Sequence, residues 1–330
     1  MEVTATGGGL ENQRPARPPR KGTRWTLALL ILLVLAAGLL VPWRRITRSI
    51  ARILRGPWPG LFYDPEGLAI DEDGNLYVAD EDPGSLSMLD PSGRRIAHVE
   101  FLPGLEERLT RGDSLVVLRK GRVILIGLHK LVEVDLEAAG GPKLVRTIGE
   151  RGRGAGQIED GEGIALDRES GDLYLTDEDN RRIDVFAPDG AFVRAWPVPA
   201  DPEGICVVGD RVYVTFSKDC WVGCFSKEGQ MRLRFGKKGS GPGEFEVPDY
   251  VTLSPSGELH VTDQKNGRIQ VFDLEGKHLR TLGGPGSAPG LFSDPEDITF
   301  DRNGNIIVAD GGNHRVQVLT PSGEPIRAFE

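Results

Sequence analysis

The sequence contains little cysteine and few aromatic residues. Of its 330 residues only three are Cys, and Phe, Trp and Tyr together make up 7%. Three cysteines cannot form the dense disulfide framework of a small secreted domain. Cys206, Cys220 and Cys224 also have no His nearby that would complete a zinc site. We therefore expect ordinary thiols, and a fold held together by hydrogen-bonded elements and apolar packing.

Positive charge is scarce outside the N-terminal segment. Residues 1–56 hold ten Lys and Arg against two acidic residues, a balance of +8. The whole chain has a net charge of −9, which leaves −17 for residues 57–330. A body this acidic repels phosphate backbones, so the composition argues against a nucleic-acid partner.

A long apolar run occurs near the N-terminus, where Trp25–Val41 contains seventeen residues without a charge. This length can span a bilayer, and Trp25 and Trp43 would mark its two interfaces. A cleaved signal peptide fits less well because of the 24-residue polar lead, and a buried core helix fits less well because five basic residues flank each side. We expect a disordered basic and polar tail over 1–24, a single-pass transmembrane helix over 25–43, and a basic juxtamembrane linker or short amphipathic helix over 44–60.

The orientation of this anchor is not fixed by charge, because the basic residues on its two sides are equal in number. The length of the chain that follows favours a cytoplasmic N-terminus. The sequence therefore predicts an extracytoplasmic body, with the opposite orientation left open.

Glycine and proline, in contrast, are abundant, with 44 and 23 residues. Two lines, DPEGLAIDEDGNLYVAD at Asp64–Asp80 and DPEDITFDRNGNIIVAD at Asp294–Asp310, are identical at nine of seventeen positions and begin 230 residues apart. A search at one fifth of that offset finds four further copies, which begin at Arg111, Asp160, Asp201 and Val247. A period of 40–50 residues without a helical pattern is typical of a propeller or a solenoid.

Each copy consists of four short apolar runs joined by turns rich in Gly, Asp and Asn. Four strands linked by hairpins make one blade of a propeller, and six blades close into a disc that protects their edges. A solenoid would need capping repeats, which the sequence does not show. We predict an all-β, six-bladed propeller over residues 61–330, with repeats near 61–103, 107–149, 153–197, 199–236, 243–283 and 289–330.

The fifth and sixth copies resemble a known repeat family. The segment GSGPGEFEVPDYVTLSPSGELHVTDQKNGRIQVFDLEGKHLRTLG, Gly239–Gly283, strongly resembles an NHL repeat, and so does Pro289–Phe329. The third copy also matches well, and the other three match loosely. The resemblance implies a six-bladed NHL-type propeller, distantly similar to gluconolactonase-like and paraoxonase-like propellers. It implies little about function, since one fold hosts many functions.

In three copies the second strand ends in Asp, and an Arg follows five residues later. These pairs are Asp177 and Arg182, Asp263 and Arg268, and Asp310 and Arg315. In the second copy the same two positions hold Ile126 and Leu131, so the positions behave as packing partners across a hairpin. We interpret the pairs as structural. Asp80 faces Ser85 instead, which leaves its role open.

An acidic residue precedes the first strand in every copy. The six are Glu66, Asp113, Glu162, Glu203, Asp249 and Glu296. Because first strands line the channel of a propeller, we expect these carboxylates to form a ring at one mouth. Loops between second and third strands would add Asp80, His129, Lys218, Lys265 and His314 to the same face.

Two interpretations of the ring remain open: a solvated acidic rim, or a set of carboxylates that converges on a cation. The resemblance to gluconolactonases and paraoxonases, which hold calcium in the channel, implies Ca²⁺ as a candidate cofactor, with Glu66, Glu203 and Glu296 as candidate ligands. Those enzymes mix Asn with acids, whereas this ring has no Asn. It has no His either, which argues against the zinc site of the NHL-like peptide-amidating lyases.

Two functions follow as hypotheses. The first is a membrane-tethered interaction module that binds a protein, a peptide or a cationic ligand on the channel-mouth face. The second is a calcium-dependent hydrolase, lactonase-like or esterase-like, with the metal in the channel. The sequence places no nucleophile beside a general base, so no catalytic residue is assigned and the first hypothesis is preferred.

Overall fold

The structure of this protein is a computed structural model that describes residues 60–81, 84–105, 109 and 113–330. All of the described residues belong to a single compact unit. The predicted transmembrane segment 25–43 and its flanks 1–24 and 44–59 lie outside the described ranges. Among the residues that the structure describes, no helix is long and apolar enough to cross a membrane.

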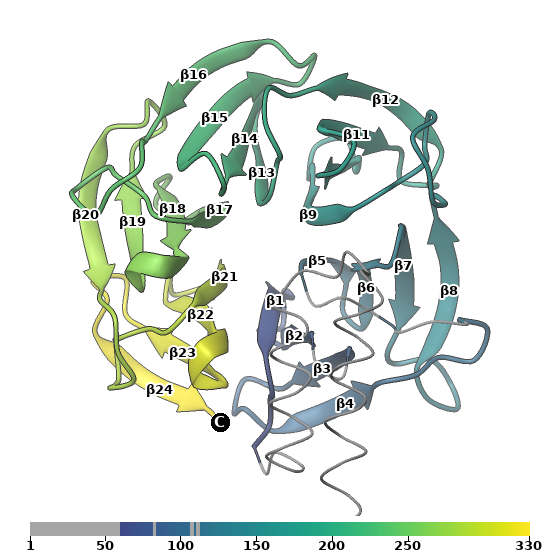
Figure 1. Ribbon diagram of the computed structural model, residues 1–330. Coiled ribbons are helices and arrows are strands. Elements are labelled where there is room, and N and C mark those ends of the chain that lie inside the picture. The colour runs from purple at the N-terminus through teal and green to yellow at the C-terminus, as the bar shows by residue number, and fades with distance from the viewer. Residues whose placement is uncertain (1–59, 82–83, 106–108, 110–112) are drawn as a thin grey trace, which may run out of the picture. The chain divides into compact units, whose positions relative to one another are not determined.

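Twenty-four strands form six four-stranded antiparallel sheets, each built from four consecutive strands (Figure 1). Blade 1 contains β1 (Pro65–Ile70), β2 (Leu76–Asp80), β3 (Ser85–Leu89) and β4 (Arg95–Val99). Blade 2 contains β5 (Leu115–Arg119), β6 (Arg122–Gly127), β7 (Lys130–Asp135) and β8 (Lys143–Ile148). Blade 3 contains β9 (Gly161–Leu166), β10 (Leu173–Asp177), β11 (Arg182–Phe186) and β12 (Phe192–Pro197).

The remaining blades repeat this arrangement. Blade 4 contains β13 (Ile205–Val208), β14 (Arg211–Phe216), β15 (Trp221–Ser226) and β16 (Met231–Phe235). Blade 5 contains β17 (Pro248–Leu253), β18 (Leu259–Asp263), β19 (Arg268–Phe272) and β20 (His278–Gly283). Blade 6 contains β21 (Pro295–Phe300), β22 (Ile306–Asp310), β23 (Arg315–Leu319) and β24 (Pro325–Phe329). Two 3₁₀ turns, η1 (Gln264–Asn266) and η2 (Gly311–Asn313), follow the second strands of blades 5 and 6.

The six sheets close into a ring in sequence order. The first strands contact one another in the order β1, β5, β9, β13, β17 and β21, and β21 returns to β1. In Figure 1 these strands surround the centre, and the fourth strands form the outer rim. The predicted all-β, six-bladed propeller is therefore confirmed. The last blade is completed by its own repeat, because β24 pairs with β23.

The local sequence explains why each blade is a meander. In the β1–β2 turn, the Oδ1 atom of Asp71 accepts hydrogen bonds from the backbone N–H groups of Asp73 (2.9 Å) and Asn75 (2.8 Å). Gly74 between them has φ +85°, which a residue without Cβ adopts at little cost. The same side-chain capping recurs in the corresponding turn of blade 6, where Asp301 bonds to Asn303 and Asn305.

The apolar core lies between neighbouring blades. Second and third strands are almost entirely buried, whereas fourth strands alternate between buried and exposed positions because only one of their faces is covered. The packed clusters join adjacent blades. One of them brings Tyr77 and Met88 of blade 1 against Val123 and Val134 of blade 2. Burial of this apolar surface supplies the main driving force that holds the ring together.

The Asp–Arg pairs anchor the connectors between blades. In blade 5, Arg268 Nε lies 2.9 Å from Asp263 Oδ2, and the guanidinium also donates to the carbonyls of Ser240, Gly241 and Glu244. In blade 6 the corresponding Nε–Oδ2 distance, from Arg315 to Asp310, is 2.8 Å. The guanidinium therefore links the end of the second strand to the Gly-rich connector. The pairs act in the structure as charge-assisted ties within the fold.

Blade 3 departs from this pattern. Arg182 Nε donates to Asp184 at 2.9 Å, and the Arg182–Asp177 distance lengthens to 3.5 Å. Burial raises the pKa of Asp184 to about 7, against the nearby positive charge of Arg182. The sequence difference between the blades accounts for this departure. In blades 5 and 6 the position of Asp184 is occupied by Gln270 and Gln317, which donate hydrogen bonds to Asp263 and Asp310.

Candidate functional site at the mouth of the channel

A β-bulge at the start of the first strand positions the ring carboxylate in four of the blades. In blade 1, Pro65 pairs with Asp80 and Leu68 pairs with Val78, so that Glu66 and Gly67 together oppose a single residue. The same register shift occurs in blades 3, 5 and 6. A bulge redirects the side chain of the extra residue, which here turns the carboxylate out of the ladder at the mouth.

The ring carboxylates of neighbouring blades lie close enough to repel one another. Burial raises the pKa of Glu66 well above its ordinary value, and the negative charges of Glu81, Asp113, Glu296 and Asp64 raise it further. Asp113 belongs to blade 2 and Glu296 to blade 6, the two blades on either side of blade 1. The structure therefore brings these three ring residues together at one place around the mouth.

Glu203 shows the same effect in blade 4. Burial raises its pKa to about 7, and the charges of Glu178 and Asp113 add to the rise. A hydrogen bond from Ser217 Oγ at 2.7 Å and the charge of Lys218 oppose it. Glu162 and Asp249, the other two ring residues, are half-buried at the corresponding positions of blades 3 and 5.

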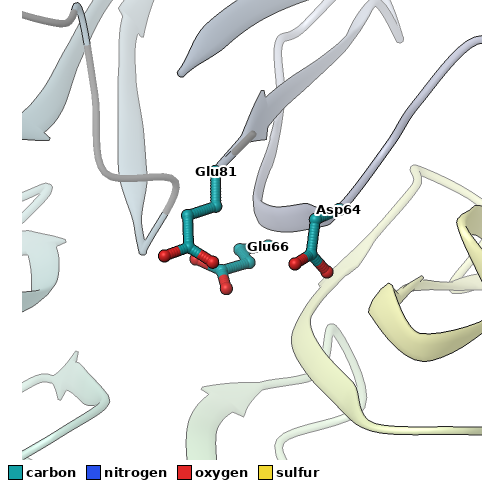
Figure 2. A group of neighbouring side chains, drawn as sticks. All are labelled: Asp64, Glu66 and Glu81. Carbon is teal, nitrogen blue, oxygen red and sulfur yellow. The ribbon is translucent and has the colours of Figure 1, made fainter. Parts of the chain in front are cut away.

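Two clusters of three carboxylates stand out at the mouth. In blade 1, Asp64, Glu66 and Glu81 each place one oxygen within 4.8 Å of the others (Figure 2). In blade 3 the corresponding residues form a cluster of the same dimensions; they are Asp160, Glu162 and Glu178. Each cluster combines the ring residue, the residue two positions before it and the residue that follows the second strand.

The spacing of these oxygens suits a bound cation. Ca²⁺ binds oxygen ligands at about 2.3–2.6 Å, so two ligands on opposite sides of the ion are roughly 5 Å apart. The 4.8 Å limit within each cluster is compatible with this geometry. Three carboxylates supply only part of a calcium coordination shell of six to eight oxygens, and water would complete it.

Neutral side chains replace the third carboxylate in blades 4 and 5. Ser217 takes that position in blade 4 and bonds to Glu203, and Gln264 takes it in blade 5, where its Nε2 donates to Glu296 Oε2 of blade 6 at 2.7 Å. Lys218 bridges Glu178 (2.5 Å) and Asp201 (2.9 Å) between blades 3 and 4. The mouth is therefore acidic all round but not six-fold symmetric.

Asp80, His129 and His314 lie near the loops at the mouth, and each forms hydrogen bonds with backbone groups. Asp80 is buried and accepts hydrogen bonds from the N–H groups of Tyr63 and Asp64, both at 2.7 Å. His314 Nδ1 donates to the carbonyl of Tyr63, which joins blade 6 to blade 1, and His129 Nδ1 donates to the carbonyl of Glu159. These contacts give the three side chains an anchoring role in the loops.

Sequence reasoning singled out the ring positions and missed the flanking acids of the two clusters. Asp64, Glu81, Asp160 and Glu178 belong to strand ends separated by about one hairpin, and only the folded β1–β2 and β9–β10 pairs bring them together. A signal was present in the sequence, since an acidic residue follows the Asp at the end of the second strand only in the first and third copies.

Comparison with known proteins agrees with this architecture. The described unit has the fold of a six-bladed β-propeller. Residues 62–87 and 292–319, in blades 1 and 6, match the NHL repeat. The chain therefore contains NHL repeats within a six-bladed β-propeller. No curated protein matches the sequence.

Several solved structures share the fold at low sequence identity. A streptogramin B lyase is 19% identical with a TM-score of 0.58, over 83% of this chain and 85% of that one. A virginiamycin B lyase from Staphylococcus aureus is 17% identical with a TM-score of 0.56, over 81% and 84%. A gluconolactonase from Xanthomonas campestris is 17% identical with a TM-score of 0.55, over 76% and 84%. At these identities the likeness establishes the fold alone.

Proposed function

We propose that the acidic mouth binds a positively charged group of a protein or peptide partner, and that residues 25–43 tether the propeller to a membrane with the mouth on the extracytoplasmic side. The observation that supports this proposal is the convergence of carboxylates from several blades, where burial and neighbouring negative charges together raise the pKa of Glu66 and Glu203. A Lys or Arg side chain entering the mouth would relieve this repulsion and would gain charge-assisted hydrogen bonds.

The surroundings of the mouth favour binding over catalysis. The imidazoles of His129 and His314 are both engaged by backbone carbonyls of neighbouring connectors. Asp80, the other candidate for a general base, is buried and bonded to two backbone N–H groups. A general base must reach the proton that it abstracts; Asp80 is committed to holding backbone, and the Nδ1 bonds leave only the Nε2 atoms of the two imidazoles for this role.

A calcium-dependent hydrolase is the second candidate function, and the two carboxylate clusters favour it. Asp64, Glu66 and Glu81, or Asp160, Glu162 and Glu178, would hold the ion. A bound calcium ion would polarise a substrate carbonyl or activate water. The residues of this chain would then fix the ion at one side of the mouth and orient an ester or lactone over it.

Titration calorimetry on the full chain separates these functions. We expect a short Arg-rich peptide to bind with an affinity that falls as salt rises, because screening weakens the attraction. Replacing Glu66, Glu203 and Glu296 together by Gln should weaken binding at least tenfold. A control with the same charge change on the outer surface is the triple replacement of Glu228, Glu275 and Glu324 by Gln, which should have little effect.

Calcium titration and a panel of lactones and esters complete the test. Peptide binding that is equal in the mouth variant and the control would overturn the proposed binding function. Hydrolysis that requires calcium and disappears in the mouth variant would establish the second function in its place.

A further inference from the structure

A layer of side chains divides the central channel just inside the ring. The position after the ring residue is Gly in blades 1, 3 and 4. In blades 3 and 4 the next blade approaches closely, and a Cβ on Gly163 would lie 2.5 Å from the carbonyl oxygen of Glu203. The other three blades carry side chains there, which are Ser114, Tyr250 and Asp297.

These side chains reach across the channel. The hydroxyl of Tyr250 lies 3.3 Å from Ser114 Oγ, although Tyr250 belongs to blade 5 and Ser114 to blade 2. Blades 2 and 5 face each other in a ring of six, so the phenol spans the channel. Asp297 of blade 6 accepts a hydrogen bond from the N–H of Leu68 in blade 1 at 2.8 Å. The layer therefore separates the acidic mouth from the rest of the channel.

On the far side of this layer lies a cavity of about 550 Å³. The first strands of all six blades line it, Tyr250 and Asp297 lie at its inner end, and none of the six ring carboxylates contributes to it. Its walls combine apolar side chains, such as Ala69, Val116 and Leu166, with the hydroxyl groups of Thr252 and Thr299. This size and lining are typical of sites for small molecules, which fall at about 300–1,000 Å³.

Polar and charged side chains line this cavity at different depths, with Asp297 at the inner end and Arg168 at the outer end. Burial raises the pKa of the Asp297 carboxyl well above its ordinary value, against hydrogen bonds from two backbone N–H groups, and raises that of the Cys206 thiol to about 12. The same desolvation would oppose a negative charge on a ligand deep in the cavity. Arg168, an exposed residue in the β9–β10 turn, also lines the cavity and brings a positive charge to its outer part.

We infer that this end of the channel binds a small amphiphile, with an apolar chain against the first strands and an anionic head group, such as a carboxylate, at Arg168. The length of strand from Tyr250 to Leu253 gives a depth of roughly 10 Å at about 3.3 Å per residue. The inner end accepts apolar atoms beside the neutral hydroxyl of Tyr250. The site is separate from the mouth and does not depend on the function proposed there.

Photolabelling of the full chain tests this inference. The probe is octanoic acid with a diazirine near the end of its chain, and peptide mass spectrometry locates the labelled residues after irradiation. We expect label on the first strands, around Val116, Leu166 and Val207. Replacing Ala69 and Thr299 by Leu narrows the cavity from two walls and should reduce this labelling at least fivefold, with circular dichroism confirming that the variant is folded.

Arg168→Gln provides a second variant, on an exposed turn where folding is not at risk. It should weaken labelling by the free acid several-fold and leave labelling by the methyl ester of the probe unchanged. Glu203→Gln at the mouth is the matched control and should label as the unchanged protein does. Label confined to the outer strands or to residues 25–43 would overturn the inference, and so would labelling that is equal in Arg168→Gln and in the unchanged protein.

Discussion

The two ends of the central channel are built by the same six strands and have opposite chemistry. At the mouth, acidic residues of neighbouring blades raise one another's pKa, as Glu66 and Glu203 show. At the other end, the same strands present mostly uncharged side chains, among them Leu, Ile, Val, Ala and Thr, around a cavity of about 550 Å³. In a propeller, each position of the first strand occurs once in every blade and therefore forms a ring around the central axis. The residue type at that position sets the polarity of the channel at that depth.

The layer between the two ends shows the effect of breaking the repeat. Gly163 and Gly204 let neighbouring backbones approach at two of its six positions, while Ser114, Tyr250 and Asp297 place side chains at three others. The contrast between charged mouth and apolar cavity therefore depends on a few residues that depart from the repeat. Substitutions at the dividing layer and at the mouth should therefore alter that contrast.

Removal of the dividing phenol should have the largest effect. Tyr250→Ala deletes an aromatic ring that packs in the channel beside blade 6, and we expect a loss of about 2–4 kcal/mol in the free energy of unfolding. Tyr250→Phe keeps the ring and removes only the hydroxyl near Ser114, which should cost about 0.5–1.5 kcal/mol. Urea denaturation measures both. Equal stability of Tyr250→Ala and the unchanged protein would show that the phenol does not fill the channel.

An additional carboxylate at the mouth should have the next largest effect. Gln264 donates to Glu296 at 2.7 Å, and its position corresponds to those of Glu81 and Glu178 in the two clusters. Gln264→Glu places a negative charge beside a buried carboxylate, so we expect a loss of about 1–3 kcal/mol at pH 8. Tighter binding of a cation at the mouth should accompany that loss.

Gln264→Met serves as the control for this change. It removes the same hydrogen bond without adding charge, so the response of its stability to calcium or to an Arg-rich peptide should stay that of the unchanged protein. If the Glu and Met variants respond alike, charge at this position does not govern the mouth. Labelling of the apolar cavity should be the same in both, because the cavity lining does not include Gln264.

The repeat made the blades and the ring predictable from sequence. Each blade is a local meander whose turns are set by residues such as Asp71 and Gly74, so the hairpins can be derived from short stretches of chain. The ring follows from one position in the repeat. The anchoring of Asp80 and His314 could not be derived in this way, because both bond to backbone groups of connectors rather than to a recognisable side-chain partner.

The dividing layer was also beyond the reach of sequence reasoning. Tyr250 and Ser114 are 136 residues apart, and their meeting depends on the blades that face each other after closure of the ring. The flanking acids of the clusters depend on the bulge that offsets β1 from β2. The Tyr250–Ser114 contact thus depends on closure of the ring, and the carboxylate clusters depend on irregular strand pairing. A repeat pattern in the sequence contains neither.

The smallest expected effect is a pH dependence of stability that arises at the mouth. Burial and neighbouring negative charges hold the pKa of Glu203 at about 7, whereas an unfolded Glu titrates near 4.3. Between these values the folded state binds more protons at Glu203 than the unfolded state does. The contribution of this group to stability is therefore complete at low pH and is lost as pH rises towards and through 7.

Glu203→Gln removes this titration and keeps the size of the side chain. We expect the stability of the unchanged protein, relative to that of the variant, to fall by about 1–2 kcal/mol between pH 5.5 and pH 8. Urea denaturation at the two pH values, in a buffer of constant ionic strength, measures the difference. A relative stability that stays constant or rises with pH would mean that the pKa of Glu203 is not raised. Glu203 would then not be destabilised in its charged form by burial and by the neighbouring carboxylates.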